Sequence, residues 1–336
     1  MVSWAEVSEE MSLQEDGIFF DDIGSYPLPR GVSLKNLSEN QYLDLVRSTL
    51  AKKIAAGVEV PTYPQFRDMV KMFMNPIADM ELAESPYLIR EENAEICELQ
   101  ALDAGQQVRV CVTGPLELYI SAFGATNYND ILYNIAKSVG HFLENARDQG
   151  RMCVASLDEP SLGISSQIAF QKDEIIEALK IASEPCKGMD CEVHLHSPLQ
   201  AELCAHVPGI SIVGIESAAH PDYLRLVDRK ILEDTDTYLR VGIARTDILS
   251  MTASLNERLA TNLWDDMPRL ENEILKMESS HVMQKRLEAA NALFGDRLRA
   301  VGPDCGLGSW PNQDIAGRIL TNCAAAVKSF RQGHGH

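Results

Sequence analysis

The chain has 336 residues, of which 45% are hydrophobic and 24% are charged. These proportions are ordinary for a soluble globular protein, and a chain of this length often forms a single α/β barrel domain. The formal net charge of −19 argues against nucleic acid and against anionic membrane surfaces as partners. We therefore expect a soluble protein with a large core and an acidic, solvated surface.

The first residues are acidic and lack the basic and apolar regions of a signal peptide, and no apolar run is long enough to span a membrane. The eight cysteines are scattered singly, several of them inside apolar runs. This is not the pattern of a disulfide framework, so we predict a reducing, cytoplasmic location.

Short apolar runs alternate with longer amphipathic segments along the whole chain. The apolar runs are rich in Val and Ile, as strands covered on both faces are. We predict strands over residues 17–25, 58–61 (the weakest), 108–114, 152–158, 191–197, 211–217, 238–244 and 298–303. Helical periodicity predicts helices over residues 40–56, 65–75, 128–149, 172–183 and 314–330, with Pro76 ending the second.

A strand followed by a helix, repeated about eight times, predicts an α/β fold: a single (β/α)8 TIM barrel. A doubly wound open sheet is the alternative, but no Gly-rich nucleotide loop follows any predicted strand. We expect one domain over residues 17–331, an N-terminal extension over 1–16 and a flexible tail over 332–336.

The segment 251–296, between the last two predicted strands, is too long for one barrel helix. Its periodicity predicts two helices, over residues 255–270 and 271–293. We expect them to form a helical extension of the barrel.

Four residues in the second half of the chain have the chemistry of metal ligands. His194 and His196 are two apart on a predicted strand and point the same way, while Glu216 and Cys305 end later strands. The carboxyl ends of barrel strands meet at one face, and this donor set suits zinc. Two buried, hydrogen-bonded histidines are the alternative, but a buried carboxylate without a partner is costly and a metal would supply one.

Zinc at such a site favours one of two reactions. It lowers the pKa of a thiol and binds the thiolate, which can then attack an electrophilic carbon. It also activates water for hydrolysis, but a hydrolase needs a general base and usually more histidines at strand ends. His206, His220 and His281 lie on predicted helices or in loops, so thiol alkylation is favoured.

Seven short segments carry further polar or glycine-containing motifs: residues 22–27, 67–70, 112–115, 157–162, 194–196, 214–217 and 303–307. In this order and spacing they resemble the C-terminal catalytic barrel of the cobalamin-independent methionine synthase family, and most of all its short "core" form. That family lies within the superfamily of uroporphyrinogen decarboxylase and methionine synthase. The resemblance extends from about residue 18 to about residue 326.

The resemblance implies a zinc-activated thiol as methyl acceptor, with the four candidate ligands holding the metal. It implies that the backbone of Ile23, Gly24 and Ser25, with the Ser25 hydroxyl, holds the carboxylate of homocysteine. Asp158 would receive the homocysteine ammonium group. Pairing of Asp158 with Arg245 is the alternative interpretation of this carboxylate.

The chain departs from the family pattern at three places. His196 replaces a usual cysteine ligand, which makes the zinc less electron-rich and a bound thiolate less nucleophilic. Leu249 stands where the family has a histidine that helps to activate a folate donor. Tyr63 belongs to a segment that replaces a His-Gly-Glu motif, so that Gln65 would partly supply the missing substrate contact. We expect Tyr63, Gln65 and Arg245 to bind the substrate together with residues 23–25 and Asp158.

Methyl-folate is a poor donor that needs acid assistance and extra binding surface, whereas a methyl–cobalt bond needs no protonation of its leaving group. These departures, and the lack of the family's N-terminal half, lead us to expect methylcobalamin or a methylated corrinoid protein as the donor, homocysteine as the acceptor and methionine as the product. One alternative is a methylcobamide:coenzyme M or other thiol methyltransferase, in which Arg245 would receive the sulfonate. Another is a non-catalytic partner of a corrinoid protein.

Overall fold

The computed structural model describes residues 17–334. Within this range seven parallel strands form one curled sheet, in the order β1-β9-β8-β7-β6-β5-β4, and a separate antiparallel pair is formed by β2 and β3. The strands are β1 (Phe19–Phe20), β2 (Ala83–Ser85), β3 (Leu88–Ile89), β4 (Val108–Thr113), β5 (Met152–Asp158), β6 (Asp190–Leu195), β7 (Ile212–Ile215), β8 (Tyr238–Ala244) and β9 (Leu298–Pro303).

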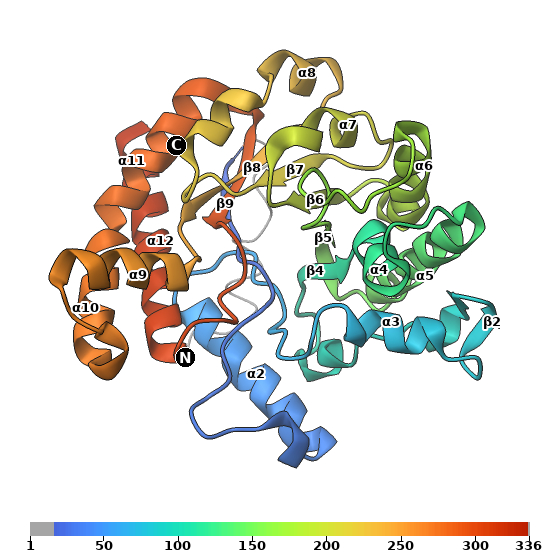
Figure 1. The fold of residues 1–336 in the computed structure, drawn as a ribbon, viewed down its shortest axis with the longest axis horizontal. Helices are drawn as coiled ribbons and strands as arrows, with labels where there is room; N and C mark the ends of the chain where they lie inside the picture. Colours follow the sequence, from blue (N-terminus) through green and yellow to red (C-terminus); the bar gives the residue numbers. More distant parts are fainter. Residues whose placement is uncertain (1–16, 335–336) are drawn as a thin grey trace.

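Helices surround the sheet, as Figure 1 shows. They are α2 (Glu39–Ala55), α3 (Lys71–Ala78), α4 (Pro115–Phe123), α5 (Asn129–Asp148), α6 (Lys172–Ser183), α7 (Ala201–Ala205), α8 (Arg229–Asp234), α9 (Ile248–Leu259), α10 (Met267–Met277), α11 (Ser280–Phe294) and α12 (Gln313–His334). The main core lies between these helices and the sheet. The alternation of strand and helix predicted from the sequence is confirmed as a parallel α/β fold consistent with a TIM barrel.

The predicted strand over residues 58–61 is not a strand in the structure. Val60 and Thr62 instead make isolated parallel bridges to Asp21 and Arg109, one at each edge of the sheet. Pro61 has no backbone N–H and cannot pair on both sides. The segment therefore joins the two edges without forming a continuous ladder.

The predicted helix over residues 65–75 begins later and ends later than expected. The Asp68 carboxylate accepts hydrogen bonds from the amides of Val70 and Lys71, which starts the helix at Lys71. Pro76 lies inside α3, so the prediction that it ends the helix is wrong. Burial of one face of α3 compensates for the single backbone hydrogen bond that the proline removes.

Residues 248–294 form three helices, not the two predicted, and Figure 1 shows them beside α12 on one side of the molecule. The first break lies at Ala260, which adopts a left-handed conformation with φ of 49°. The Asp266 side chain then caps α10 by accepting from the amide of Arg269. The second break lies at Glu278, after which Ser279 is the N-cap residue of α11.

The last helix, α12, runs to His334 and so includes residues 332–334 of the predicted tail. The predicted N-terminal extension over residues 1–16 lies outside the described part of the chain, as do residues 335–336. Among the helices that the structure describes, none is long and apolar enough to cross a membrane. All eight cysteines lie in the described range and are free.

The inside of the curled sheet is layered along the strands. Phe19, Val60, Val154, Ile212 and Ala300 form a small apolar cluster near the amino ends of the strands. Inward-facing positions recur every second residue along a strand. Two residues beyond the members of this cluster stand Asp21, Thr62, Ser156, Gly214 and Gly302. The two glycines leave space that charged side chains occupy, those of Asp21, Glu192 and Arg240.

Candidate metal centre

The structure brings the four predicted metal ligands together at the carboxyl ends of β6, β7 and β9. Their candidate ligand atoms all lie within 4.8 Å of one another. His196 Nε2 lies 3.3 Å from Glu216 Oε1 and 3.5 Å from Cys305 Sγ. The His194 and His196 rings are 5.7 Å apart between centroids. Two nitrogens, one oxygen and one sulfur therefore converge on a single point.

His194 is the buried member of this cluster, with 1% of its surface exposed. Within residues 17–334, neither of its ring nitrogens has a hydrogen-bond partner. An unpartnered buried polar atom is costly, and a metal ion at this point would satisfy one of the two nitrogens. The donor set and this orphaned imidazole both fit a zinc ion.

The protonation equilibria of the cluster are strongly shifted. Burial raises the pKa of Glu216 to about 7 and lowers that of His196 to about 4, with the neighbouring His194 adding to the second shift. For His194, burial lowers the pKa, but the Cys305 thiol and the Glu192 carboxylate outweigh it and raise the pKa to about 10. These three side chains compete for protons. A divalent cation that displaced the protons would stabilise the deprotonated, metal-binding forms of the side chains.

Asp304 fixes the loop that carries Glu216 against the loop that carries Cys305. Its two carboxylate oxygens accept hydrogen bonds from the amides of Ala218 and Ala219, each at 2.8 Å. Burial raises the pKa of Asp304 to about 6, against the effect of these two amides. Asp304 lies in the motif of residues 303–307, but this role could not be predicted from the motif.

Two of the predicted substrate-binding residues flank the cluster. Asp158 ends β5, where it is the register partner of His194 on β6, and it accepts a hydrogen bond from Ser156 Oγ at 2.8 Å. Ser25 packs against the turn after Cys305, because a Cβ added at Gly306 would lie 1.9 Å from Ser25 Oγ. Ile23 and Gly24 precede Ser25 and are buried.

The remaining three predicted residues have partners within the protein, and Gln65 also lies against Gly24 and Ser25, since its backbone amide donates to the Gly24 carbonyl at 2.9 Å. Tyr63 is fully buried and donates its hydroxyl to the carbonyl of Cys111. Gln65 donates its amide to the same carbonyl at 3.2 Å and to the Tyr63 hydroxyl at 2.9 Å. Arg245 pairs with Asp247 at 2.6 Å, so the alternative interpretation, in which Arg245 pairs with Asp158, is wrong.

A charged layer that was not predicted from the sequence lies beneath the cluster and consists of Asp21, Arg109, Glu192 and Arg240. All four side chains are at most 1% exposed. Burial raises the pKa of Glu192, but the two arginines and His194 outweigh it and hold the pKa at about 2. The layer could have been predicted from charged residues that lie inside apolar strands, such as Glu192 two residues before His194.

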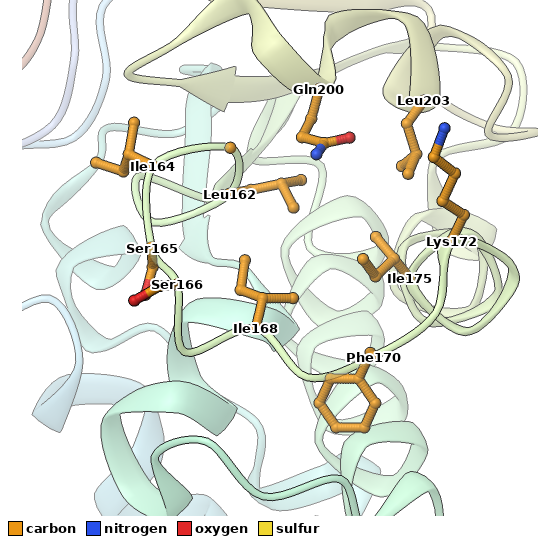
Figure 2. Close-up of a pocket in the computed structure, with 11 residues that line it drawn as sticks. Leu162, Ile164, Ser165, Ser166, Ile168, Phe170, Lys172, Ile175, Gln200 and Leu203 are labelled. Atoms are coloured by element: carbon orange, nitrogen blue, oxygen red, sulfur yellow. The ribbon is translucent and has the colours of Figure 1, made fainter.

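A cavity of about 360 Å³ lies under the loop that follows β5. Figure 2 shows Leu162 and Ile168 of this loop on the side of Ile175 of α6 and Leu203 of α7, whereas the Phe170 ring points away from these two residues. Phe170 packs edge-on against Tyr119 of α4. None of the residues that line the cavity is a candidate ligand or substrate-binding residue. The candidate centre and this cavity are therefore separate features of the same end of the sheet.

No protein-family model matches the chain, and no curated protein matches it. Solved structures do match. A B12-independent methionine synthase from Shewanella sp. W3-18-1, in complex with selenomethionine, superimposes with a TM-score of 0.63 at 14% identity, covering 94% of this chain and 98% of that one. The chain shares its fold.

Two further structures give weaker matches. An endo-β-1,4-mannanase from Thermotoga petrophila has a TM-score of 0.49 at 12% identity, over 95% of this chain and 78% of that one. A homocysteine methyltransferase from Escherichia coli has a TM-score of 0.46 at 14% identity, over 95% of this chain and 99% of that one. At such identities the likeness concerns the fold alone, so any statement about the reaction depends on the residues of this chain.

Proposed function

We propose that this chain is a zinc-dependent methyltransferase that methylates the thiol of homocysteine to give methionine. The observation that carries this proposal is the convergence of His194, His196, Glu216 and Cys305, whose ligand atoms lie within 4.8 Å of one another. In this proposal the fold is a (β/α)8 barrel in which residues 58–62 take the place of one strand. The helices between β8 and β9 are its extension.

Zinc held by these four residues would lower the pKa of a thiol and bind the thiolate. The chain's own residues would orient the acceptor. Ser25, against the turn that carries Cys305, would donate to the amino-acid carboxylate. Asp158, the register partner of His194, would accept from the ammonium group on the opposite flank. Both contacts bring the thiol of a short amino acid to the metal.

Homocysteine is a better acceptor for this site than coenzyme M. Coenzyme M carries a sulfonate and no ammonium group, so it would leave Asp158 without a counterion. The cation that the sulfonate needs is not free, because Arg245 makes two hydrogen bonds to the Asp247 carboxylate, at 2.9 and 2.6 Å. Asp158 and the occupied Arg245 together favour an acceptor with an ammonium group.

The donor in this proposal is a methylated corrinoid on a protein. The sulfur–carbon bond forms as the cobalt–carbon bond breaks, and the electron pair of the broken bond stays on cobalt. No proton is needed by the leaving group, which suits Leu249 at the position of the family's histidine. Exposed apolar side chains follow four consecutive strands of the sheet and suit a macromolecular donor: Ile164, Leu199, Leu226 and Leu249, which are 59%, 66%, 58% and 68% exposed.

The test is an assay of purified, zinc-loaded protein with homocysteine and either methylcobalamin or methyl-folate, and with coenzyme M as the competing acceptor. We expect methionine from methylcobalamin. Methionine from methyl-folate alone would overturn the donor, and methylation of coenzyme M in preference to homocysteine would overturn the acceptor. A protein that binds neither zinc nor thiol would instead be a non-catalytic partner of a corrinoid protein.

A further inference from the structure

Glu192 lies directly beneath His194 on the inner face of the sheet. The two residues are two apart on β6, so their side chains point the same way. The Glu192 carboxylate fits there because β7 presents a glycine: a Cβ added at Gly214 would lie 2.2 Å from Glu192 Oε1. The sequence therefore places a carboxylate, and the room for it, one layer below the proposed metal.

Two arginines hold this carboxylate in place. Glu192 Oε2 lies 2.9 Å from Arg109 Nη2, and Glu192 Oε1 lies 3.9 Å from Arg240 Nε. Both arginines also contact Asp21, at 3.5 Å from Arg109 Nε and at 2.9 Å from Arg240 Nη2. Two positive and two negative charges make a neutral, fully buried network, so Glu192 can stay ionised without water.

The two carboxylates of the network differ in whether their oxygens already accept hydrogen bonds. Asp21 accepts hydrogen bonds from Arg240 Nε at 3.0 and 3.2 Å. In the described part of the chain, neither oxygen of Glu192 is engaged in a hydrogen bond, since its contacts with the arginines lack the geometry. Glu192 Oε1 lies 3.7 Å from His194 Nδ1. The unused acceptor thus faces an imidazole nitrogen that also has no partner.

We infer that Glu192 is a positioning residue for His194: its carboxylate accepts a hydrogen bond from the Nδ1–H, which keeps the proton on Nδ1 and leaves the Nε2 lone pair to the metal. A carboxylate behind a histidine ligand fixes the tautomer and the orientation of the ring and makes the ligand more basic. The inference rests on the proposed function, because it needs a metal at His194. If Glu192 has this role, the charged layer supports the metal ligands and does not only pack the interior of the barrel.

The test compares Glu192→Gln with Asp21→Asn. Each variant removes one negative charge from the same buried network, but only the first changes the partner of His194. We expect Glu192→Gln to weaken zinc binding about 10- to 100-fold and Asp21→Asn to change it less than about threefold, measured by competition with a chromophoric chelator. Nitrogen NMR of the zinc-loaded wild type should show a protonated Nδ1 on His194, and Glu192→Gln should alter that signal.

If Glu192→Gln does not fold, the pair Glu192→Gln/Arg109→Met and Asp21→Asn/Arg109→Met carries the same comparison with the charge balance restored. Equal zinc affinity within either pair would overturn the positioning role. That outcome is separable from failure of the proposed function, because the wild type would then still bind zinc and Cys305→Ala would still lose it. A wild type that binds no zinc would overturn both.

Discussion

Cys305 Sγ lies 3.5 Å from His196 Nε2, although the two residues are 109 positions apart in the chain. They follow β9 and β6, which are separated in the sheet by β7 and β8. In a flat sheet, side chains three strands apart could not touch, because neighbouring strands are about 4.8 Å apart. The contact therefore depends on the curl of the sheet, which directs the ends of β6 and β9 toward a common centre.

Removal of the thiol at this contact should remove the metal. We expect Cys305→Ala to lose zinc affinity by roughly 100-fold or more, beyond the loss typical of a residue that only supports a ligand. Elemental analysis after dialysis against a weak chelator measures it. Cys97→Ala, at a partly exposed cysteine outside the cluster, is the control and should retain zinc. Full zinc occupancy in Cys305→Ala would contradict the proposed ligand set.

Alkylation should single out Cys305 in the metal-free protein. Five of the eight cysteines are buried, and of the other three, burial raises the pKa of Cys97 to about 11 and that of Cys153 to about 12. At pH 8 these two are overwhelmingly protonated, and only the thiolate reacts with iodoacetamide. Mass spectrometry should find Cys305 modified first and protected when zinc is added. Labelling of Cys305 that zinc does not slow would argue against coordination.

Asp158→Asn should raise the KM for homocysteine. Loss of a charged hydrogen-bond acceptor typically costs about 1.5–3 kcal/mol, or roughly 10- to 100-fold in affinity. A short thiol that lacks the amino group should be unaffected, and zinc content should not change. The ratio of the two KM values, in wild type and variant, separates substrate recognition from damage to the metal site. An equal effect on both thiols would remove Asp158 from the substrate pocket.

Leu249→Ser should weaken the use of a corrinoid protein more than the use of free methylcobalamin. Leu249 is 68% exposed at the start of α9, where a protein donor would cover it. Leu293→Ser, at an exposed leucine near the end of α11, is the matched control. Steady-state assays with both donors measure the effect. If the two variants behave alike, the apolar side chains around the site do not bind the donor.

Gly214→Ala should destabilise the protein because its Cβ would lie 2.2 Å from Glu192 Oε1. Overpacking in a closed interior costs about 1–3 kcal/mol. Gly140→Ala is the control: its Cβ would meet no atom closer than 3.5 Å, and alanine in a helix interior gains about 0.5–1 kcal/mol over glycine. Urea denaturation of both variants gives the free energies of unfolding. A neutral Gly214→Ala would mean that Glu192 has room to move.

Local patterns in the sequence determined much of the fold and predicted the four candidate ligands that the structure brings together. Apolar runs fixed β4 to β9 to within one or two residues at each end, since strands buried on both faces leave a clear signal. The spacing of His194 and His196 put both on one face of a strand, which needs no knowledge of the rest of the fold. By contrast, hydrophobic periodicity does not predict that Pro61 interrupts a strand or that helices end at Ala260 and Glu278. These interruptions depend on the local hydrogen bonding and conformation of the backbone.

Only the tertiary structure decided which charged residues lie next to one another inside the sheet. Arg245 pairs with Asp247 and not with Asp158, and Glu192 stands between two arginines from β4 and β8. The sequence contains each of these residues, but their pairing depends on strand register and on how far the sheet curls. The sequence thus determined which chemical groups reach one end of the sheet, because side-chain direction alternates along a strand. The structure decided which of them touch, because contact between distant strands is a property of the whole sheet.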